Sequence, residues 1–149
     1  MDRIATEVER DPNYKNIMHA QRTEPEATGA DAISAAARQI AETLILAAIC
    51  CYTSSGGTAM RAARERPMTP ILALSPVLGT ARRLSLVWGL HCVAGPEPDT
   101  LEHMIDRACH LAVREQFAKP GERIIVTAGT PLGKTGVTNM LRVAFVDGE

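Results

Sequence analysis

A run of six small residues could bind an anion: Thr53, Ser54, Ser55, Gly56, Gly57 and Thr58. An unbroken apolar run, residues 44–52, precedes it, and an Ala/Arg-rich segment that ends at Pro67 follows it. This order predicts a buried strand, a loop and a helix. Backbone N–H groups and hydroxyls at the N-terminus of a helix attract phosphate or sulfate. The alternative is an ordinary helix cap, in which Thr58 or a serine satisfies the first N–H groups and no ligand binds.

A second loop rich in Gly and Thr, residues 130–138, contains a lysine that could reach a bound phosphate, Lys134. The stretch 128–135 imitates a P-loop, but Gly129 stands one position late. A strand is predicted after it, whereas a P-loop requires a helix there. We therefore do not expect NTP hydrolysis, and a phosphotransferase that uses Lys134 stays an alternative for an ATPase assay to decide. A solvated loop lysine is the other interpretation of Lys134.

The cysteines and histidines form no metal site or catalytic group in the sequence. The four cysteines, Cys50, Cys51, Cys92 and Cys109, include no C-x-x-C pair. Neighbouring residues of a strand, such as Cys50 and Cys51, point to opposite faces, so we expect reduced, buried thiols. His91 is expected to be a structural residue. No catalytic residue and no metal ligand is predicted.

Helices and strands alternate along most of the chain. Helices are predicted over 1–10, 31–43, 59–66, 81–87 and 99–117, strands over 44–52, 70–76, 89–95, 123–129 and 140–146, and a linker over 11–30. In the helix over 31–43, Thr28 or Asp31 is the expected cap, and the expected buried residues are Ile33, Ala36, Ala37, Ile40 and Ala41. The alternation predicts an α/β sandwich with a mostly parallel sheet. About ten residues separate the last two strands, too few for a parallel crossover, so the last strand should be antiparallel and near an edge.

The predicted topology brings the two loops together. Both the 53–58 loop and the 130–138 loop follow the carboxyl ends of strands. Ligands of open α/β sheets gather at that edge, so the two loops can face one pocket. This convergence favours the anion site over the plain helix cap.

Length and composition exclude several classes of protein. The 149 residues suit one domain of ordinary size. The net charge of −1 gives no reason to expect binding to nucleic acid or to a membrane surface. No segment is long enough to span a bilayer, and the start has no apolar core of the kind that a signal peptide needs. We expect a cytoplasmic protein.

Several stretches resemble the C-terminal domain of bacterial pyruvate kinases. They include Cys51-Tyr-Thr-Ser-Ser-Gly-Gly-Thr-Ala, Pro70-Ile-Leu-Ala-Leu-Ser-Pro, Trp88-Gly, Phe117-Ala-Lys-Pro-Gly-Glu-Arg and Val126-Thr-Ala-Gly. The resemblance covers residues 28–147, in order and with the expected spacing. It implies a three-layer α/β/α domain whose five-stranded sheet is mostly parallel, with the last strand antiparallel.

The resemblance also implies what each part of the chain does. Residues 1–27 would be the end of the preceding catalytic barrel and a linker, and residues 28–149 the regulatory domain. In the family the barrel transfers a phosphoryl group from phosphoenolpyruvate to ADP with magnesium and often potassium. This chain lacks that barrel, so we expect it to be inactive alone and to hold none of those ions.

By resemblance, this domain binds a phosphorylated effector, a sugar phosphate or AMP. The phosphate would lie on Thr53, Ser54, Ser55, Gly56, Gly57 and Thr58. The loop that closes over it would contain Pro131, Gly133, Lys134 and Gly136. The last strand would join two copies, giving a dimer of this chain and a tetramer of the full enzyme. The alternatives are a purely structural assembly domain with a vestigial site and a stand-alone phospho-ligand-binding protein.

Overall fold

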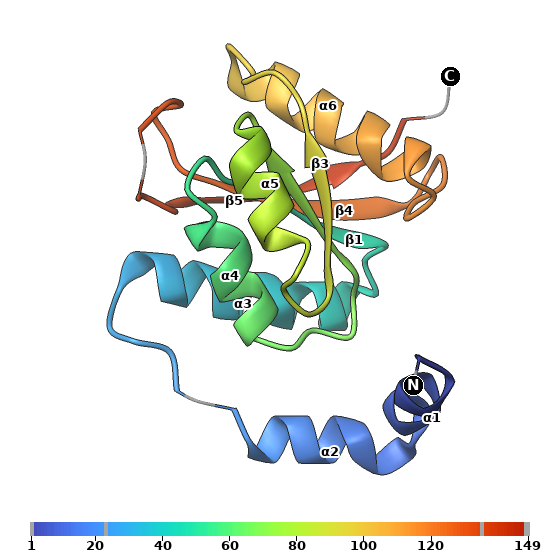
Figure 1. Cartoon of the computed structure of the whole chain (residues 1–149). Helices are drawn as coiled ribbons and strands as arrows, with labels where there is room; N and C mark the ends of the chain where they lie inside the picture. The colour runs from blue at the N-terminus through green and yellow to red at the C-terminus, as the bar shows by residue number, and fades with distance from the viewer. Residues whose placement is uncertain (1, 23, 135, 148–149) are drawn as a thin grey trace.

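A five-stranded sheet forms the centre of the computed structural model, which describes residues 2–22, 24–134 and 136–147 (Figure 1). The elements are α1 (Asp2–Arg10), α2 (Pro12–Ala20), α3 (Gly29–Leu44), β1 (Ala48–Tyr52), α4 (Gly57–Arg64), β2 (Ile71–Ser75), α5 (Leu78–Leu84), β3 (Leu90–Ala94), α6 (Leu101–Arg114), β4 (Arg123–Ala128) and β5 (Met140–Phe145). The strand order is β3-β2-β1-β4-β5. Only the β4–β5 pair is antiparallel among these strands, which confirms the predicted direction and edge position of the last strand.

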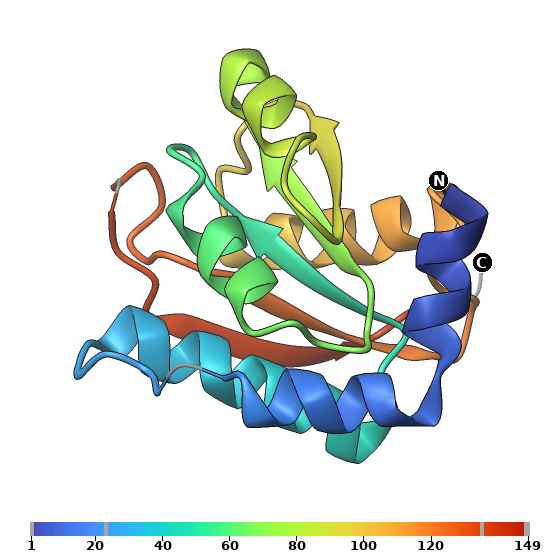
Figure 2. The ribbon, with the colours of Figure 1, turned by 60° about the horizontal axis from the view of Figure 1, so that its bottom comes forward.

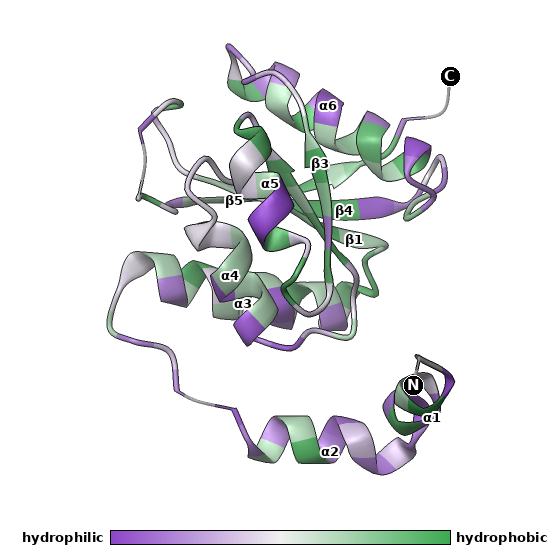
Figure 3. Ribbon diagram, viewed as in Figure 1, coloured by the Kyte–Doolittle hydropathy of each residue, from purple (hydrophilic) through white to green (hydrophobic). Residues whose placement is uncertain are grey.

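The sheet separates two hydrophobic cores, so the domain has the predicted three layers (Figure 2). Helix α6 closes one core, and α3, α4 and α5 contribute to the other. Cys50 belongs to the first core and its neighbour Cys51 to the second, as expected for successive residues of a strand. Figure 3 shows that the strands are mainly hydrophobic, in green, and that most hydrophilic residues, in purple, lie on the surrounding helices and loops.

The first strand begins later than the apolar run predicts. Residues 44–52 were expected to form it, but α3 continues to Leu44 and β1 starts at Ala48. Ile45 ends the helix in a left-handed conformation with φ of 53°, and the Leu46 N–H donates to the Ala41 carbonyl. The error has a simple cause, because an apolar run lacks a signal that divides a helix end from a buried strand.

Helix α3 buries a row of small residues. Its N-cap is Thr28, whose hydroxyl accepts a hydrogen bond from the Asp31 N–H. The buried members are Asp31, Ser34, Ala37 and Ala41, and the half-buried Ile40 packs against the same core as Ala37 and Ala41. The expected stripe was therefore wrong at Ala36, which is exposed, and at Ile33, which is only half-buried. Small side chains allow the close contact that α3 makes with α4.

Two other predicted segments need correction. A linker was expected over 11–30, but Asp11 caps α2 by accepting a hydrogen bond from the Asn13 N–H, and Pro12 occupies the first turn. Proline with a capping aspartate starts a helix as readily as it ends one. Helix α5 begins at Leu78, three residues before the predicted 81–87. No described helix has the length and apolar character needed to cross a membrane.

Candidate functional site

The two candidate loops lie side by side at one edge of the sheet (Figure 1). The 53–58 loop follows β1, and the 130–138 loop follows β4, the parallel neighbour of β1. A hydrogen bond between the hydroxyls of Thr58 and Thr138 joins them. The predicted convergence of the two loops is therefore confirmed, although Thr135 of the second loop lies outside the described residues.

A cavity opens between these loops. Of the residues predicted to bind or cover the ligand, its walls contain Thr53, Ser54, Ser55, Gly57, Thr58, Gly133, Lys134 and Gly136. Gly56 and Pro131 are not among the wall residues. Gly56 instead supports the wall as the N-cap of α4, with φ of 102°, a conformation that favours glycine. Pro131 accepts a hydrogen bond from the Lys134 N–H within the second loop.

Helix α4 begins at this cavity without a side-chain cap. Two of the hydroxyls that could have capped it are used elsewhere: Thr58 bonds to Thr138, and the Thr53 hydroxyl accepts from the Gly56 N–H at 2.9 Å. Within the described residues, the hydroxyls of Ser54 and Ser55 make no hydrogen bond. The first N–H groups of a helix need an external acceptor when no cap is present, so this end of α4 is open to an anion.

The backbone of the serine pair is held from the opposite side. The Thr80 hydroxyl donates to the Ser54 carbonyl at 2.9 Å, and Arg83 donates to the Ser55 carbonyl at 3.4 Å. Both donors come from α5. Carbonyl oxygens would repel an anion, and these two are occupied by donors outside the cavity wall. Arg83 therefore helps to fix the loop from outside the cavity.

Arg61 is a wall residue that the sequence reasoning missed. It lies one turn after Gly57 on α4, and its side chain reaches back to the cavity. A Cβ atom at Gly57 would stand 3.0 Å from Arg61 Nη1, so the glycine leaves room for the guanidinium beside the loop. The i, i+4 spacing of Gly57 and Arg61 on a predicted helix could have indicated this contact.

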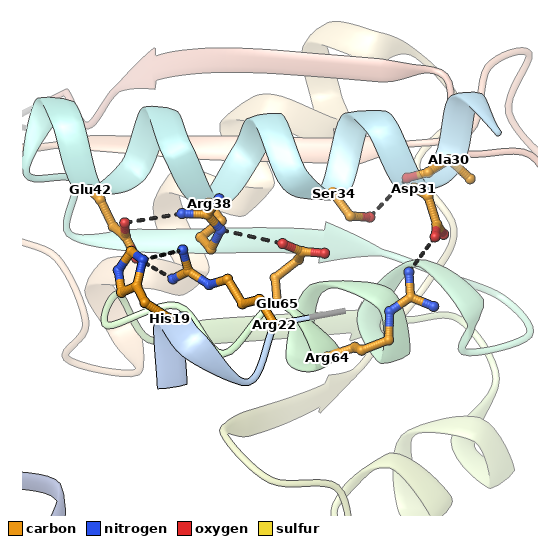
Figure 4. Close-up of polar contacts among 9 residues, drawn as sticks. All are labelled: His19, Arg22, Ala30, Asp31, Ser34, Arg38, Glu42, Arg64 and Glu65. Carbon is orange, nitrogen blue, oxygen red and sulfur yellow. Dashed lines mark hydrogen bonds and ion pairs between the residues drawn. The ribbon is translucent and has the colours of Figure 1, made fainter. Parts of the chain in front are cut away.

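Asp31 forms an ion pair with Arg61, as it does with Arg64, whose pair is drawn in Figure 4. Its carboxylate is 1% exposed, accepts a hydrogen bond from the Glu26 N–H at 2.9 Å and pairs with Arg64. The other carboxylate oxygen lies 3.2 Å from Arg61 Nε. The Glu26 N–H, and then Arg64 and Arg61, lower the pKa of Asp31 below its ordinary value of 3.8 despite the opposing effect of burial. Asp31 therefore stays ionised and orients the arginine.

A second group of ion pairs connects α3 and α4 to the residues after α2 (Figure 4). Arg38 lies between Glu42 and Glu65, at 3.2 and 3.3 Å, with the carboxylates largely buried. Arg22 lies 3.5 Å from Glu42 and bonds to the His19 ring at 2.8 Å. These contacts fix α4 against α3 and so fix the direction in which the N-terminus of α4 points.

The other chemically active residues are placed away from the cavity. His91 bonds to Glu115 at 2.9 Å and packs edge to face on Phe117, with ring centroids 5.0 Å apart, so it has the structural role that was predicted. The His103 ring is hydrogen-bonded to the Asp99 carboxylate. Among the described residues, no group of three His, Cys, Asp or Glu side chains could hold a metal ion.

Comparison with known proteins agrees with this architecture. The family model described as "Pyruvate kinase, alpha/beta domain" matches residues 31–144. The chain is 50% identical over 149 residues to a pyruvate kinase of Methylorubrum extorquens, covering 100% of this chain and 31% of that protein. It is 39% identical over 143 residues to one of Agrobacterium vitis, covering 96% of this chain and 30% of the relative. It is 36% identical over 146 residues to a pyruvate kinase of Geobacillus stearothermophilus, covering 98% of this chain and 25% of that protein.

The chain spans about a third or less of the length of these relatives, at their C-terminal end. The family model covers most of the chain, including the sheet and both loops of the cavity. The chain therefore belongs to the pyruvate kinase family, in which it corresponds to the C-terminal alpha/beta domain.

Proposed function

We propose that this chain is the regulatory and assembly domain of a pyruvate kinase and binds a phosphorylated metabolite at the 53–58 loop. The observation that carries the proposal is the uncapped N-terminus of α4, which opens into a cavity between two loops. The catalytic step of a full enzyme, phosphoryl transfer from phosphoenolpyruvate to ADP with magnesium and potassium, would belong to a barrel outside this chain. The expected compartment is the cytoplasm.

The cavity offers a phosphate the groups that it needs. The hydroxyls of Ser54 and Ser55 can donate to phosphate oxygens, and so can the first backbone N–H groups of α4. The helix adds a partial positive charge of about half an elementary charge at this end. Arg61 supplies a full positive charge and a forked set of donors suited to phosphate. Lys134, on the loop at the mouth of the cavity, supplies a second cation.

Isothermal titration calorimetry tests ligand binding. The candidates are glucose 6-phosphate, ribose 5-phosphate, AMP and fructose 1,6-bisphosphate, and at least one should release or absorb heat with a one-to-one stoichiometry. Ser55→Asp should abolish that binding, because it places a carboxylate against the phosphate. Ser85→Asp is the matched control, since Ser85 is exposed at the end of α5 and away from the cavity walls. Absence of heat with every ligand would contradict the proposal.

An assembly role is supported by the free edge of β5. Among the described strands β5 pairs only with β4, and Phe145 on it is 65% exposed. Beside it, a groove of about 830 Å³ runs between β5 and α6, lined by Cys109, His110, Val113, Arg142 and Phe145 among others. An exposed strand edge with a large apolar side chain is a natural surface for a second copy of the chain. We expect a dimer of this chain and a tetramer of the full enzyme.

Light scattering, combined with the same calorimetry, distinguishes the assembly role of the domain from its ligand-binding role. The chain should have the mass of a dimer, and Phe145→Lys should shift it toward the monomer because a buried charge on a shared strand edge is costly. A dimer that gives no heat with any phosphorylated ligand would favour the alternative, a structural assembly domain with a vestigial site. A monomer that binds ligand would favour a stand-alone phospho-ligand-binding protein.

A further inference from the structure

Three charged side chains line the cavity, and they come from different parts of the fold: Arg61, Glu97 and Lys134. Arg61 belongs to α4, on one face of the sheet. Glu97 lies in the segment that leads from β3 into α6, which covers the other face (Figure 1). Lys134 lies on the covering loop. The cavity is therefore polarised between a cation on one wall and a carboxylate on another.

The phosphate end of the cavity is the end at Arg61. The Nε atom of Arg61 lies 3.2 Å from the Asp31 carboxylate, and the Nη1 atom of Arg61 lies at the 53–58 loop, beside Gly57. One edge of the guanidinium is thus occupied by a buried carboxylate, and the other edge faces the uncapped helix end. Donors of the helix, the serines and Arg61 all converge on this end.

Glu97 places a negative charge in another part of the cavity wall. It is exposed, and among the described residues it has neither an ion pair nor a hydrogen bond. Its Oε1 atom would lie 3.8 Å from a Cβ atom at Gly133, so the carboxylate stands against the loop that covers the cavity. An ionised carboxylate accepts hydrogen bonds from hydroxyls, whereas it repels a phosphate.

The total charge of the cavity walls also favours a ligand with one phosphate. The side chains give two positive charges and one negative charge, and the helix end adds a fraction of a positive charge. One phosphomonoester carries about −1.5 to −2 at pH 7, which these walls can balance. A bisphosphate carries about twice that charge, which these walls do not balance, and the carboxylate of Glu97 in the wall adds repulsion for a second phosphate.

We propose that this cavity selects a ligand with a single phosphate and free hydroxyls, and discriminates against a bisphosphate through Glu97. The inference rests on the proposed phosphate site and adds the class of ligand to it. Both a sugar monophosphate and a nucleoside monophosphate have this chemistry. Ribose 5-phosphate and AMP separate these two sources, since they share the phosphorylated ribose and differ in the base.

The test compares two ligands that differ by one phosphate, fructose 6-phosphate and fructose 1,6-bisphosphate, by calorimetry on the whole chain. The wild-type chain should bind the monophosphate at least about tenfold more tightly, the size expected for an unfavourable charge contact. Glu97→Gln keeps the shape and removes the charge, so it should reduce that ratio about tenfold, mainly by improving affinity for the bisphosphate. Glu102→Gln, an exposed change on α6 outside the cavity walls, should leave the ratio unchanged.

The possible failures are distinguishable. If the wild-type chain binds the bisphosphate as tightly as the monophosphate, or if Glu97→Gln leaves the ratio as it was, the selectivity inference is wrong and the phosphate site stands. If neither fructose phosphate, ribose 5-phosphate nor AMP binds, the phosphate site itself is wrong and the inference falls with it.

Discussion

The hydroxyl oxygens of Thr58 and Thr138 lie 2.7 Å apart, although 80 residues separate them in the chain. Thr58 stands in the first turn of α4, and Thr138 precedes β5. Both residues are buried, at 7% and 4% exposure, so this hydrogen bond is shielded from water. It ties the helix end that would bind a phosphate to the loop that would cover it, and the two walls of the cavity are fixed relative to each other.

A double-mutant cycle should show this link as a coupling energy. Thr58→Val and Thr138→Val each leave one buried hydroxyl without its partner, which should reduce the free energy of unfolding by about 1–3 kcal/mol. The double variant should lose less than the sum, with a coupling of about 1 kcal/mol, because it removes both hydroxyls together. Urea unfolding followed by circular dichroism measures all four proteins. Additive effects would mean that the two hydroxyls do not stabilise one another.

Asp31→Asn should remove part of the pH dependence of stability. The pKa of Asp31 is lowered in the folded chain by the Glu26 N–H and then by Arg64 and Arg61, so its ionised form stabilises the fold. That contribution is complete above the ordinary value of 3.8 and is lost as the pH falls below it through the folded pKa. The free energy of unfolding should therefore fall more steeply between pH 6 and pH 3 in the wild-type chain than in the variant. An equally steep fall of the free energy of unfolding with pH in both proteins would contradict the stabilising role of ionised Asp31. Asp99 and Glu115, whose pKa values are also lowered, are common to both proteins.

The ion pairs of Arg38 should matter more than those at the surface. Arg38→Met leaves the carboxylates of Glu42 and Glu65, which are 14% and 7% exposed, without their main partner. Breaking a buried pair in this way costs about 3 kcal/mol or more. The matched change Arg10→Met removes an exposed pair with Glu7 and should cost less than about 1 kcal/mol. Equal losses in thermal or urea unfolding would show that burial of the Arg38 pairs contributes nothing.

The four thiols should differ in their reactivity toward a disulfide reagent at pH 8. Burial raises the pKa of Cys51 to about 11 and raises that of Cys50 well above its ordinary value. Burial also raises the pKa of Cys92 and Cys109, but these two are only half-buried. Because the thiolate is the reactive form, Cys92 and Cys109 should react in the folded chain and Cys50 and Cys51 only after denaturation. Reaction of all four at one rate would contradict the two buried positions.

The sequence contained enough information for the sheet and for both loops of the site, but not for Arg61. The short connection before Met140 fixed the direction of β5, and the polar residues after Tyr52 indicated the loop. The end of α3 at Leu44 could not be predicted, because the last residue of the helix and the whole of the following strand lie in one apolar run. Arg61 was missed for another reason: its role depends on the empty space at Gly57 and on the position of Asp31, both of which arise only when α3 packs on α4.

Amide chemical shifts of the ¹⁵N-labelled chain during a titration with inorganic phosphate test the central claim most directly. If phosphate binds the uncapped end of α4, the largest shifts should fall on residues 54–59, with smaller ones on the 130–138 loop, and should saturate. Sodium chloride at the same ionic strength should not reproduce them. Shifts that are absent, that never saturate, or that gather in the groove between α6 and β5 would contradict a phosphate site at this loop.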